Sequence, residues 1–337
     1  MRLMVDTQGA KLRKAGERLL VDVDGETRES LPLNLVEQLV LTGRGVQATT
    51  PLLYDLVGRG IDVVYQNQGE RFAFRLVGPF SKHSALRVAQ IRRLTQAQPA
   101  LRLARAIVAG KLNNQAVILR RYAYAAEGAA QARLQQAVQV IQTAMERARN
   151  AGDADSLRGY EGSGAAAYFA AWPALFDAGQ WGFQGRAYYP PPDPINAMLS
   201  LGYTLLLNAI VSDCYRIGLD PDVGCFHTLN YGRPSLALDL EEEFRPIIVD
   251  ALVLALVRQD LLQPGDFRKG RGKRAGATMT DDARRFFMER YEARLGIRVR
   301  HPAWQQQLTL RQCITRQVEH MARCIEGRDA EYVPMMM

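Results

Sequence analysis

The feature that most constrains this fold is a change in hydrophobic period near residue 78. Before it, apolar and polar residues alternate with the two-residue period of β-strands, in short segments bounded by Gly, Asp or Asn. After Gly78 and Pro79, from Ser81 onward, Leu, Val, Ile and Ala recur at helical spacing. The chain of 337 residues also exceeds the usual size of one domain. The sequence therefore predicts a two-domain α+β protein, with a β-rich N-terminal domain and an all-α C-terminal domain.

The predicted domain boundaries follow these changes of pattern. We expect a β-rich domain over residues 1–78, a linker over 79–84, an α-helical domain over 85–327 and a disordered tail over 328–337. One short helix in the first domain is indicated by Thr49-Thr50-Pro51, an N-cap followed by a first-turn proline. Helices of the second domain are expected at 81–110, 112–126, 130–150, 154–171, 193–217, 241–260, 280–295 and 303–325.

Charge and cysteine content narrow the class of protein. An excess of 43 Lys and Arg over 35 Asp and Glu gives a formal charge of +8, which suits a polyanionic partner without identifying one. The four cysteines form no CxxC pair, and Cys313, His320 and Cys324, which would share a helical face, are interpreted as core rather than as a zinc site. Neither a signal peptide nor an apolar segment of bilayer length is evident, so we expect a cytoplasmic protein.

Residues 218–246, GLDPDVGCFHTLNYGRPSLALDLEEEFRP, hold the most chemical information. If a helix has begun by Asp239, this residue and Glu242 share one face and could bind one cation. Acidic residues in a first helical turn are equally explained by capping and by the helix macrodipole. A lone loop histidine such as His227 is more often structural than catalytic. The local sequence of Glu161, RGYEGSGAAAYF, does not connect it to His227, so a metal site and a structural role both remain open.

A series of motifs, in order along the chain, resembles a known family. They are EG followed by AAAYF, then YYPPPDPINAMLSLGYTLLLN, then GLDP and the histidine loop, then SLALDLEEEFRP. With the β-rich start, the helix ending AGKLNNQAVILRR and the segment beginning DFRKG, they resemble the CRISPR-associated endonuclease and integrase of the spacer-adaptation complex, the first of the numbered Cas proteins. The resemblance covers the chain to about residue 325.

The resemblance implies a metal site. In that family a glutamate, a histidine and a further acidic residue hold the metal, and these match Glu161, His227 and Glu242, while Asp239 matches a supporting acid. Two carboxylates and one imidazole favour Mg²⁺ or Mn²⁺. The implied activity joins the 3′-hydroxyl ends of spacer DNA to the CRISPR array by transesterification, and nicks or cleaves DNA. No nucleotide cofactor is expected, because the chain has no GxxxxGK[ST] phosphate-binding loop.

The resemblance also implies partners. These are double-stranded and branched DNA, a second copy of the chain paired through the β-rich domain, and a small ferredoxin-like adaptation protein that bridges two dimers. Dimerisation would also cover the strand edges of a small β domain.

Candidate DNA-backbone contacts are basic residues near the site or in a basic loop. They are Arg186, Arg245, Arg268, Lys269, Arg271, Lys273 and Arg274. Asn196 is interpreted as scaffolding near the site, since an asparagine near a helix start often organises hydrogen bonds. Tyr188 and Tyr189 could stack on a base, but aromatic residues beside prolines more often pack. Glu241 and Glu243 match no family position and are expected to be solvated or paired with arginines.

Two other functions fit the same residues. One is a basic DNA-binding assembly protein without chemistry, against which the three ligand-type residues argue. The other is a general repair nuclease that acts on branched DNA with the same metal site. Genomic neighbourhood, rather than sequence, would separate the second from spacer adaptation.

Overall fold

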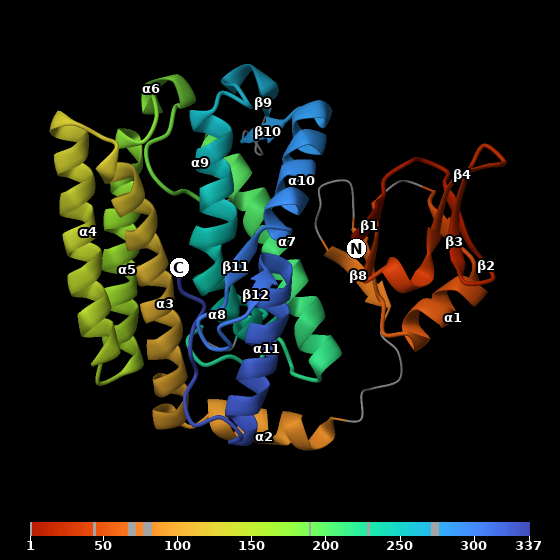
Figure 1. Ribbon diagram of the computed structural model, residues 1–337, viewed down its shortest axis with the longest axis horizontal. Coiled ribbons are helices and arrows are strands. Elements are labelled where there is room, and N and C mark those ends of the chain that lie inside the picture. Colours follow the sequence, from red (N-terminus) through yellow and green to blue (C-terminus); the bar gives the residue numbers. More distant parts are fainter. Residues whose placement is uncertain are drawn as a thin grey trace. The chain divides into compact units, whose positions relative to one another are not determined.

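The computed structural model describes residues 2–42, 45–66, 72–76, 83–188, 190–227, 230–270 and 276–337. The chain forms two compact units, Met1–Ser84 and Ala85–Met337. The first is built mainly from strands and the second mainly from helices (Figure 1), which confirms the predicted α+β class. The Gly78-Pro79 break and most of the expected linker 79–84 lie outside the described residues.

The N-terminal unit contains two four-stranded sheets, with the strand orders β1-β5-β7-β8 and β4-β3-β2-β6. Its elements are β1 (Arg2–Val5), β2 (Lys11–Ala15), β3 (Arg18–Val23), β4 (Glu26–Pro32), β5 (Gln38–Leu41), β6 (Gln47–Ala48), α1 (Thr50–Gly58), β7 (Asp62–Gln66) and β8 (Phe72–Leu76). Apolar residues of both sheets and of α1 form one core, as the alternating pattern predicts. The tight β2–β3 turn requires a positive φ, which Gly16 supplies at +57°.

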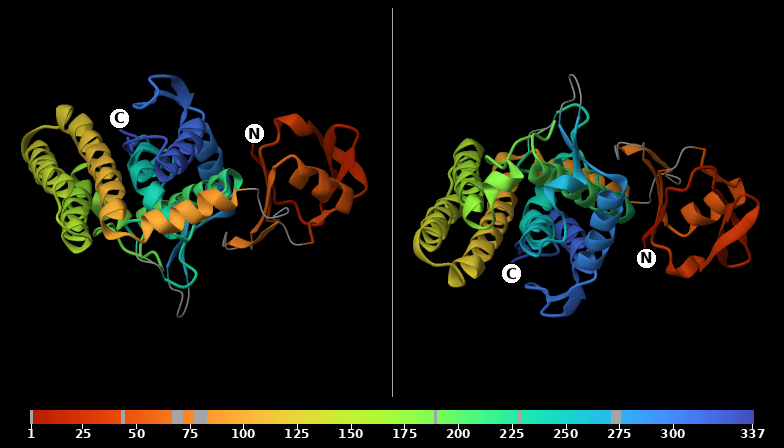
Figure 2. Two further views of the ribbon diagram at one scale, coloured as in Figure 1. Left: turned by 90° about the horizontal axis from the view of Figure 1, so that it is seen from below. Right: turned by 90° about the horizontal axis from the view of Figure 1, so that it is seen from above.

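The C-terminal unit is mainly helical, with two short hairpins. Its elements are α2 (Ser84–Leu94), α3 (Ala97–Tyr124), α4 (Gly128–Arg149), α5 (Ala154–Ala171), α6 (Ala178–Trp181), α7 (Pro194–Ile217), α8 (Ser235–Phe244), the π-helical turn η3 (Arg245–Asp250), α9 (Ala251–Arg258), β9 (Phe267–Lys269), β10 (Ala277–Met279), α10 (Asp281–Leu295), β11 (Arg298–Arg300), β12 (Gln307–Thr309) and α11 (Leu310–Glu326). Helices α3, α4 and α5 lie side by side (Figures 1 and 2), and α3 also contacts α8, which packs on α7. Helix α3 therefore lies between the α4–α5 pair and the α7–α8 pair.

Several helices differ from the sequence prediction. The expected helix 81–110 is interrupted, because α2 ends at Leu94 and α3 begins at Ala97, and the expected helix 303–325 begins only at Leu310, after β12. We expected a helix to end near Gly110, but α3 continues through it. A Cβ at this glycine would lie 2.6 Å from Cβ of Pro334, so Gly110 provides room for the C-terminal segment instead of breaking the helix. The expected helix 241–260 begins earlier, at Ser235, and contains the π-helical turn η3 at Pro246, a residue that cannot donate the usual helical hydrogen bond.

The final residues of the chain pack against the core. We expected a disordered tail over 328–337, and this expectation is wrong, because Tyr332 and Met335 are buried. The Tyr332 hydroxyl and the Met335 N–H both donate to the Glu243 carboxylate, and Asn114 Nδ2 donates to the Met335 carbonyl at 2.8 Å. Hydrogen bonds to a buried carboxylate thus hold a segment that the sequence pattern leaves unassigned.

Helix α7 forms part of the same core. Asp193 caps it by accepting the N–H of Asn196 at 2.8 Å, and Gly218 ends it with a φ of +100°. By length and composition α7 could cross a membrane, and it is the one described helix for which this is true. Most of its apolar window is buried inside the unit, as in the core helix of a folded domain.

Candidate metal centre

Helix α8 supplies two of the expected site residues. It begins at Ser235, so Asp239 lies beyond its first turn, and no acidic residue stands in that turn. The capping explanation for Asp239 and Glu242 is therefore removed. Asp239 is completely buried and Glu242 is 3% exposed. Buried carboxylates need compensating partners, because transfer out of water without them is costly.

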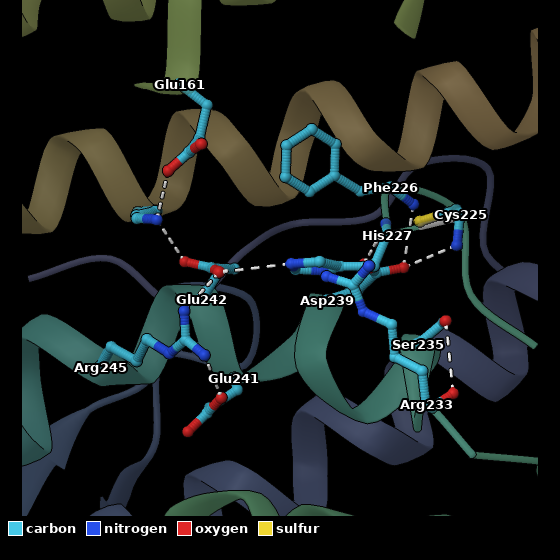
Figure 3. Close-up of polar contacts among 11 residues, drawn as sticks. Glu161, Cys225, Phe226, His227, Arg233, Ser235, Asp239, Glu241, Glu242 and Arg245 are labelled. Atoms are coloured by element: carbon cyan, nitrogen blue, oxygen red, sulfur yellow. Dashed lines mark hydrogen bonds and ion pairs between the residues drawn. The ribbon is translucent and has the colours of Figure 1, made fainter. Parts of the chain in front are cut away.

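Asp239 organises the histidine loop (Figure 3). Its Oδ2 accepts the backbone N–H groups of Cys225 at 2.6 Å and Phe226 at 3.0 Å, and its Oδ1 accepts that of His227 at 2.8 Å. Oδ1 also lies 2.7 Å from Nδ1 of His227, where the carboxylate favours the protonated nitrogen. A Cβ at Gly224 would lie 2.6 Å from Oδ2, so only glycine lets the loop approach this closely.

The tautomer of His227 directs its free nitrogen to Glu242. With Nδ1–H donating to Asp239, Nε2 carries the lone pair, and it lies 3.8 Å from Oε1 of Glu242. A carboxylate behind a ligating histidine is the arrangement that metal sites use to orient the imidazole. Asp239 therefore acts on this site through His227.

Glu161 reaches the same place from α5. Lys111, in the middle of α3, forms ion pairs with Oε1 of Glu161 and, at 2.5 Å, with Oε2 of Glu242. Helices α3 and α5 can pack closely because Gly164 has no Cβ; a Cβ at this position would collide with the Leu112 side chain. The structure thus brings together Glu161, His227 and Glu242, the three residues that the family resemblance selected.

Lys111 was missed at the level of sequence. It stands in the largely apolar run AIVAGKLNNQAVIL, and a single lysine in such a run is a signal for a buried ion pair. Although burial opposes this, the carboxylates of Glu242 and Glu161 raise the pKa of Lys111. Burial would raise the pKa of Glu242, but the positive charges of Arg245 and Lys111 outweigh it and hold that pKa below its usual value. Glu242 is therefore ionised, as a metal ligand must be.

Arg245 neutralises the acidic cluster. Its guanidinium donates to Oε1 of Glu242 at 2.6 Å and to Oε2 of Glu241 at 2.7 Å, and it lies 4.9 Å from the centre of the Tyr203 ring. The expected pairing of Glu241 with an arginine is confirmed. The expectation for Glu243 is wrong, because this residue is fully buried and binds the C-terminal segment.

Asn196 holds a second basic residue near the site. Its Oδ1 accepts the N–H of Ala187 and Nη1 of Arg186, each at 2.9 Å, and its Nδ2 donates to the carbonyl of Gly185 at 2.9 Å. The Arg186 guanidinium lies 5.0 Å from the centre of the exposed Tyr188 ring. Arg186, Arg245, Glu161 and Lys111 line one cavity of about 730 Å³. Asn196 thus positions the loop that carries Arg186, consistent with its interpretation as scaffolding.

Of the remaining candidates for DNA contact, two are described. Arg268 and Lys269 are exposed on β9, which pairs with β10. Arg271, Lys273, Arg274 and Tyr189 lie outside the described residues. Contact with DNA stays a prediction for all of the basic residues named above.

A second group of possible metal ligands consists of His320, Cys324 and Asp329. Nδ1 of His320 lies 2.9 Å from Asp329, and its Nε2 accepts the N–H of Val333 at 2.9 Å, so neither ring nitrogen is free for a metal. Burial raises the pKa of Cys324 to about 11, which disfavours the thiolate. Cys313 and Cys324 both belong to the apolar core, as expected.

A family model described as CRISPR associated protein Cas1 matches residues 3–293 of this chain, which covers parts of both units and all of the site. The chain belongs to the Cas1 family. The predicted resemblance is thereby confirmed. Relatives in this family are named CRISPR-associated endonucleases, so the nuclease class of activity predicted from the motifs is supported at that level.

Relatives of the Cas1 family match over nearly the whole chain. CRISPR-associated endonuclease Cas1 2 of Rhodospirillum rubrum is 35% identical over 340 residues, covering 98% of this chain and 96% of the relative. CRISPR-associated endonuclease Cas1 1 of Moorella thermoacetica is 33% identical over 337 residues, covering 99% and 97%. A Cas4 exonuclease and Cas1 endonuclease fusion of Rhodospirillum rubrum is 35% identical over 331 residues, and the match spans 56% of that longer protein.

Solved structures share the fold. A Cas1 protein from Thermotoga maritima has a TM-score of 0.81 at 20% identity, with 98% of each chain covered. A casposase bound to an integration product has a TM-score of 0.78 at 18% identity, covering 98% of this chain and 93% of the casposase. At these identities the likeness concerns the fold alone.

Proposed function

We propose that this chain is a divalent-metal-dependent DNA endonuclease and integrase of CRISPR adaptation. One observation carries the proposal. Glu161, Glu242 and His227 come from α5, α8 and the preceding loop, and all three direct a potential ligand atom to one small region beside a 730 Å³ cavity. The likeness to endonucleases at 35% and 33% identity supports the same conclusion.

The residues fit a divalent metal. Two carboxylates and a neutral imidazole form a donor set suited to Mg²⁺ or Mn²⁺. Oε2 of Glu242 is buried and accepts no hydrogen bond among the described residues, its contact being the ion pair with Lys111. When bound, such a cation would stabilise charge on the phosphoryl oxygens of DNA and favour ionisation of the attacking hydroxyl.

The chain's own residues perform the positioning. Asp239 holds His227 in the tautomer that leaves Nε2 free, and Arg245 balances the charge of Glu242. Arg186 faces the same cavity and is suited to a phosphate oxygen. With a DNA 3′-hydroxyl as nucleophile, one phosphodiester bond forms as another breaks, so transesterification needs no nucleotide cofactor. With water as nucleophile, the same arrangement cleaves DNA.

Partners belong to the same proposal. We infer that the chain pairs with a second copy through its β-rich unit and binds double-stranded and branched DNA. A structure of a Cas6-RT-Cas1 and Cas2 complex has a TM-score of 0.80 at 20% identity, over 36% of the matched chain, which supports a Cas2-type partner here. We infer that this partner is the small ferredoxin-like protein that the family resemblance implies.

The test is a strand-transfer assay with Mn²⁺. A short labelled duplex with free 3′-hydroxyl ends is joined to a supercoiled plasmid by wild type, by His227→Ala and by the control His83→Ala, whose histidine is exposed. His227→Ala should lower joining by about 100-fold or more, because a ligand and its orientation are lost together. Unchanged joining by a folded His227→Ala protein would show that the site lies elsewhere.

A further inference from the structure

The ammonium group of Lys111 lies where the acidic ligands of the site converge. It contacts Oε1 of Glu161 and lies 2.5 Å from Oε2 of Glu242, while 93% of the Lys111 residue is shielded from solvent (7% exposed). The side chains of Glu161 and Glu242 are 19% and 3% exposed. The two carboxylates therefore share one cation that belongs to the chain itself.

A cation at this place has a structural function without any metal. Two carboxylates facing each other with little solvent repel, and removal of one partner from a buried ion pair is strongly destabilising. Glu161 lies on α5 and Glu242 on α8, so Lys111 on α3 is the link between the helices that carry the ligands. Arg245 pairs with Oε1 of Glu242 but has no described contact with Glu161.

The ammonium and a divalent metal exclude each other. A metal ligated by Glu161 and Glu242 would stand about 2.0–2.2 Å from their oxygens, in the space that Nζ now fills. A divalent metal and the Lys111 ammonium cannot both occupy this space, and two cations so close together repel strongly in a site with little water. Lys111 must therefore move before both carboxylates can serve as ligands.

A hydrogen-bond acceptor in the same cavity could bind the displaced Lys111 ammonium. Gln115 lies one turn after Lys111 on α3, so the two residues share a helix face, and both line the 730 Å³ cavity. Oε1 of Gln115 is buried and has no hydrogen-bond partner among the described residues. A buried acceptor without a donor is costly, and an ammonium group would satisfy it.

We propose that Lys111 is a resident counter-cation, which holds Glu161 against Glu242 in the metal-free protein and moves toward Gln115 when a divalent metal binds. This inference rests on the proposed metal site. It makes Lys111 a positioning residue that competes with the metal, so the apparent metal affinity includes the cost of displacing the ammonium.

The test compares wild type with Lys111→Met, which keeps the length of the side chain and removes its charge, and with Lys11→Met, a control at an exposed position. Thermal unfolding is measured in EDTA, and Mn²⁺ binding is measured by calorimetry. In EDTA, Lys111→Met should unfold about 6 °C or more below wild type. Its Mn²⁺ dissociation constant should be at least about tenfold lower than that of wild type, because the competitor is absent. Lys11→Met should match wild type in both measurements.

An Mn²⁺ affinity of Lys111→Met equal to or weaker than that of wild type would overturn the proposal. If neither protein binds Mn²⁺, the proposed metal function fails, and the counter-cation is then tested alone by Lys111→Met/Glu161→Gln. This double variant should recover the stability that Lys111→Met loses in EDTA, and no recovery would refute the counter-cation. If Lys111→Met does not fold, Gln115→Leu tests the displacement of Lys111. It should weaken Mn²⁺ binding, because it removes the acceptor for the displaced ammonium, and unchanged binding would refute the displacement.

Discussion

Replacement of Asp239 by asparagine tests how the centre is assembled. The carboxylate receives four donors, namely the N–H groups of Cys225 and Phe226 on Oδ2 and the N–H and Nδ1 of His227 on Oδ1. An amide of the same shape keeps one accepting oxygen and turns an NH₂ group toward the other two donors. If the NH₂ replaces Oδ2, two hydrogen bonds to a charged acceptor are lost; if it replaces Oδ1, the backbone bond of His227 is lost and its imidazole must change tautomer. At about 1.5 kcal/mol for each lost bond, the free energy of unfolding should fall by about 1.5–3 kcal/mol.

The same substitution should disturb metal binding through His227. If the amide NH₂ faces Nδ1, the imidazole must accept there and carry its proton on Nε2, where the ligand lone pair is needed. We expect Mn²⁺ affinity to fall about 10- to 100-fold, as for other partners of ligating histidines. Urea unfolding followed by circular dichroism gives the stability, and calorimetry gives the affinity.

The matched control is Asp282→Asn, at a side chain that is 95% exposed and paired with Arg285 at 3.5 Å. It should change stability by less than about 0.5 kcal/mol. A loss below about 1 kcal/mol for Asp239→Asn, with normal Mn²⁺ affinity, would refute the role assigned to this carboxylate.

Two further predictions concern packing and pH. Gly202→Ala should lower the free energy of unfolding in urea by about 1–3 kcal/mol, because the new Cβ would collide with Val249. The control Gly159→Ala, in the open part of α5, should be neutral or stabilising by up to about 1 kcal/mol. Equal effects of the two substitutions would contradict this packing. Burial raises the pKa of Glu243 to about 7 from 4.5, against the hydrogen bonds that lower it. The folded protein then holds a proton between about pH 5 and 7 that the unfolded chain has released, so the free energy of unfolding should fall as pH rises through this range and level off above it. Burial also raises the pKa of Glu241 to about 7 and that of Asp250 to about 6, so these groups contribute to the same slope. Glu243→Gln should therefore make the profile less steep, and an unchanged slope would exclude a contribution from Glu243.

Helical and strand periods identified most of the fold in advance. They located the two-domain α+β organisation and most of the helices, because these patterns report which face of each element is buried. They failed at Gly110 and at the C-terminal segment. Gly110 lies against Pro334, and Met335 of the C-terminal segment binds Glu243, 92 positions away, and Asn114, 221 positions away. No local pattern records contacts between residues so far apart in the chain.

The residues of the candidate centre were also predicted from the sequence only in part. Spacing identified Asp239 and Glu242 as a pair, but capping explained them equally well until α8 was seen to begin at Ser235. Glu161 was identified only by the family resemblance. Lys111, which lies 50 residues before Glu161 in the chain, was identified only by the structure.

The sequence by itself thus determined the acidic residues and the histidine of the centre, a helix that includes Glu242 and, through its motifs, the family to which the chain belongs. Only the tertiary structure decided that Glu161 and Glu242 both contact Lys111, and that His227 lies beside Glu242. The physical reason is that ion pairs between buried groups depend on how α3, α5 and α8 pack, and this packing is set by side-chain volume and glycine contacts across the whole unit.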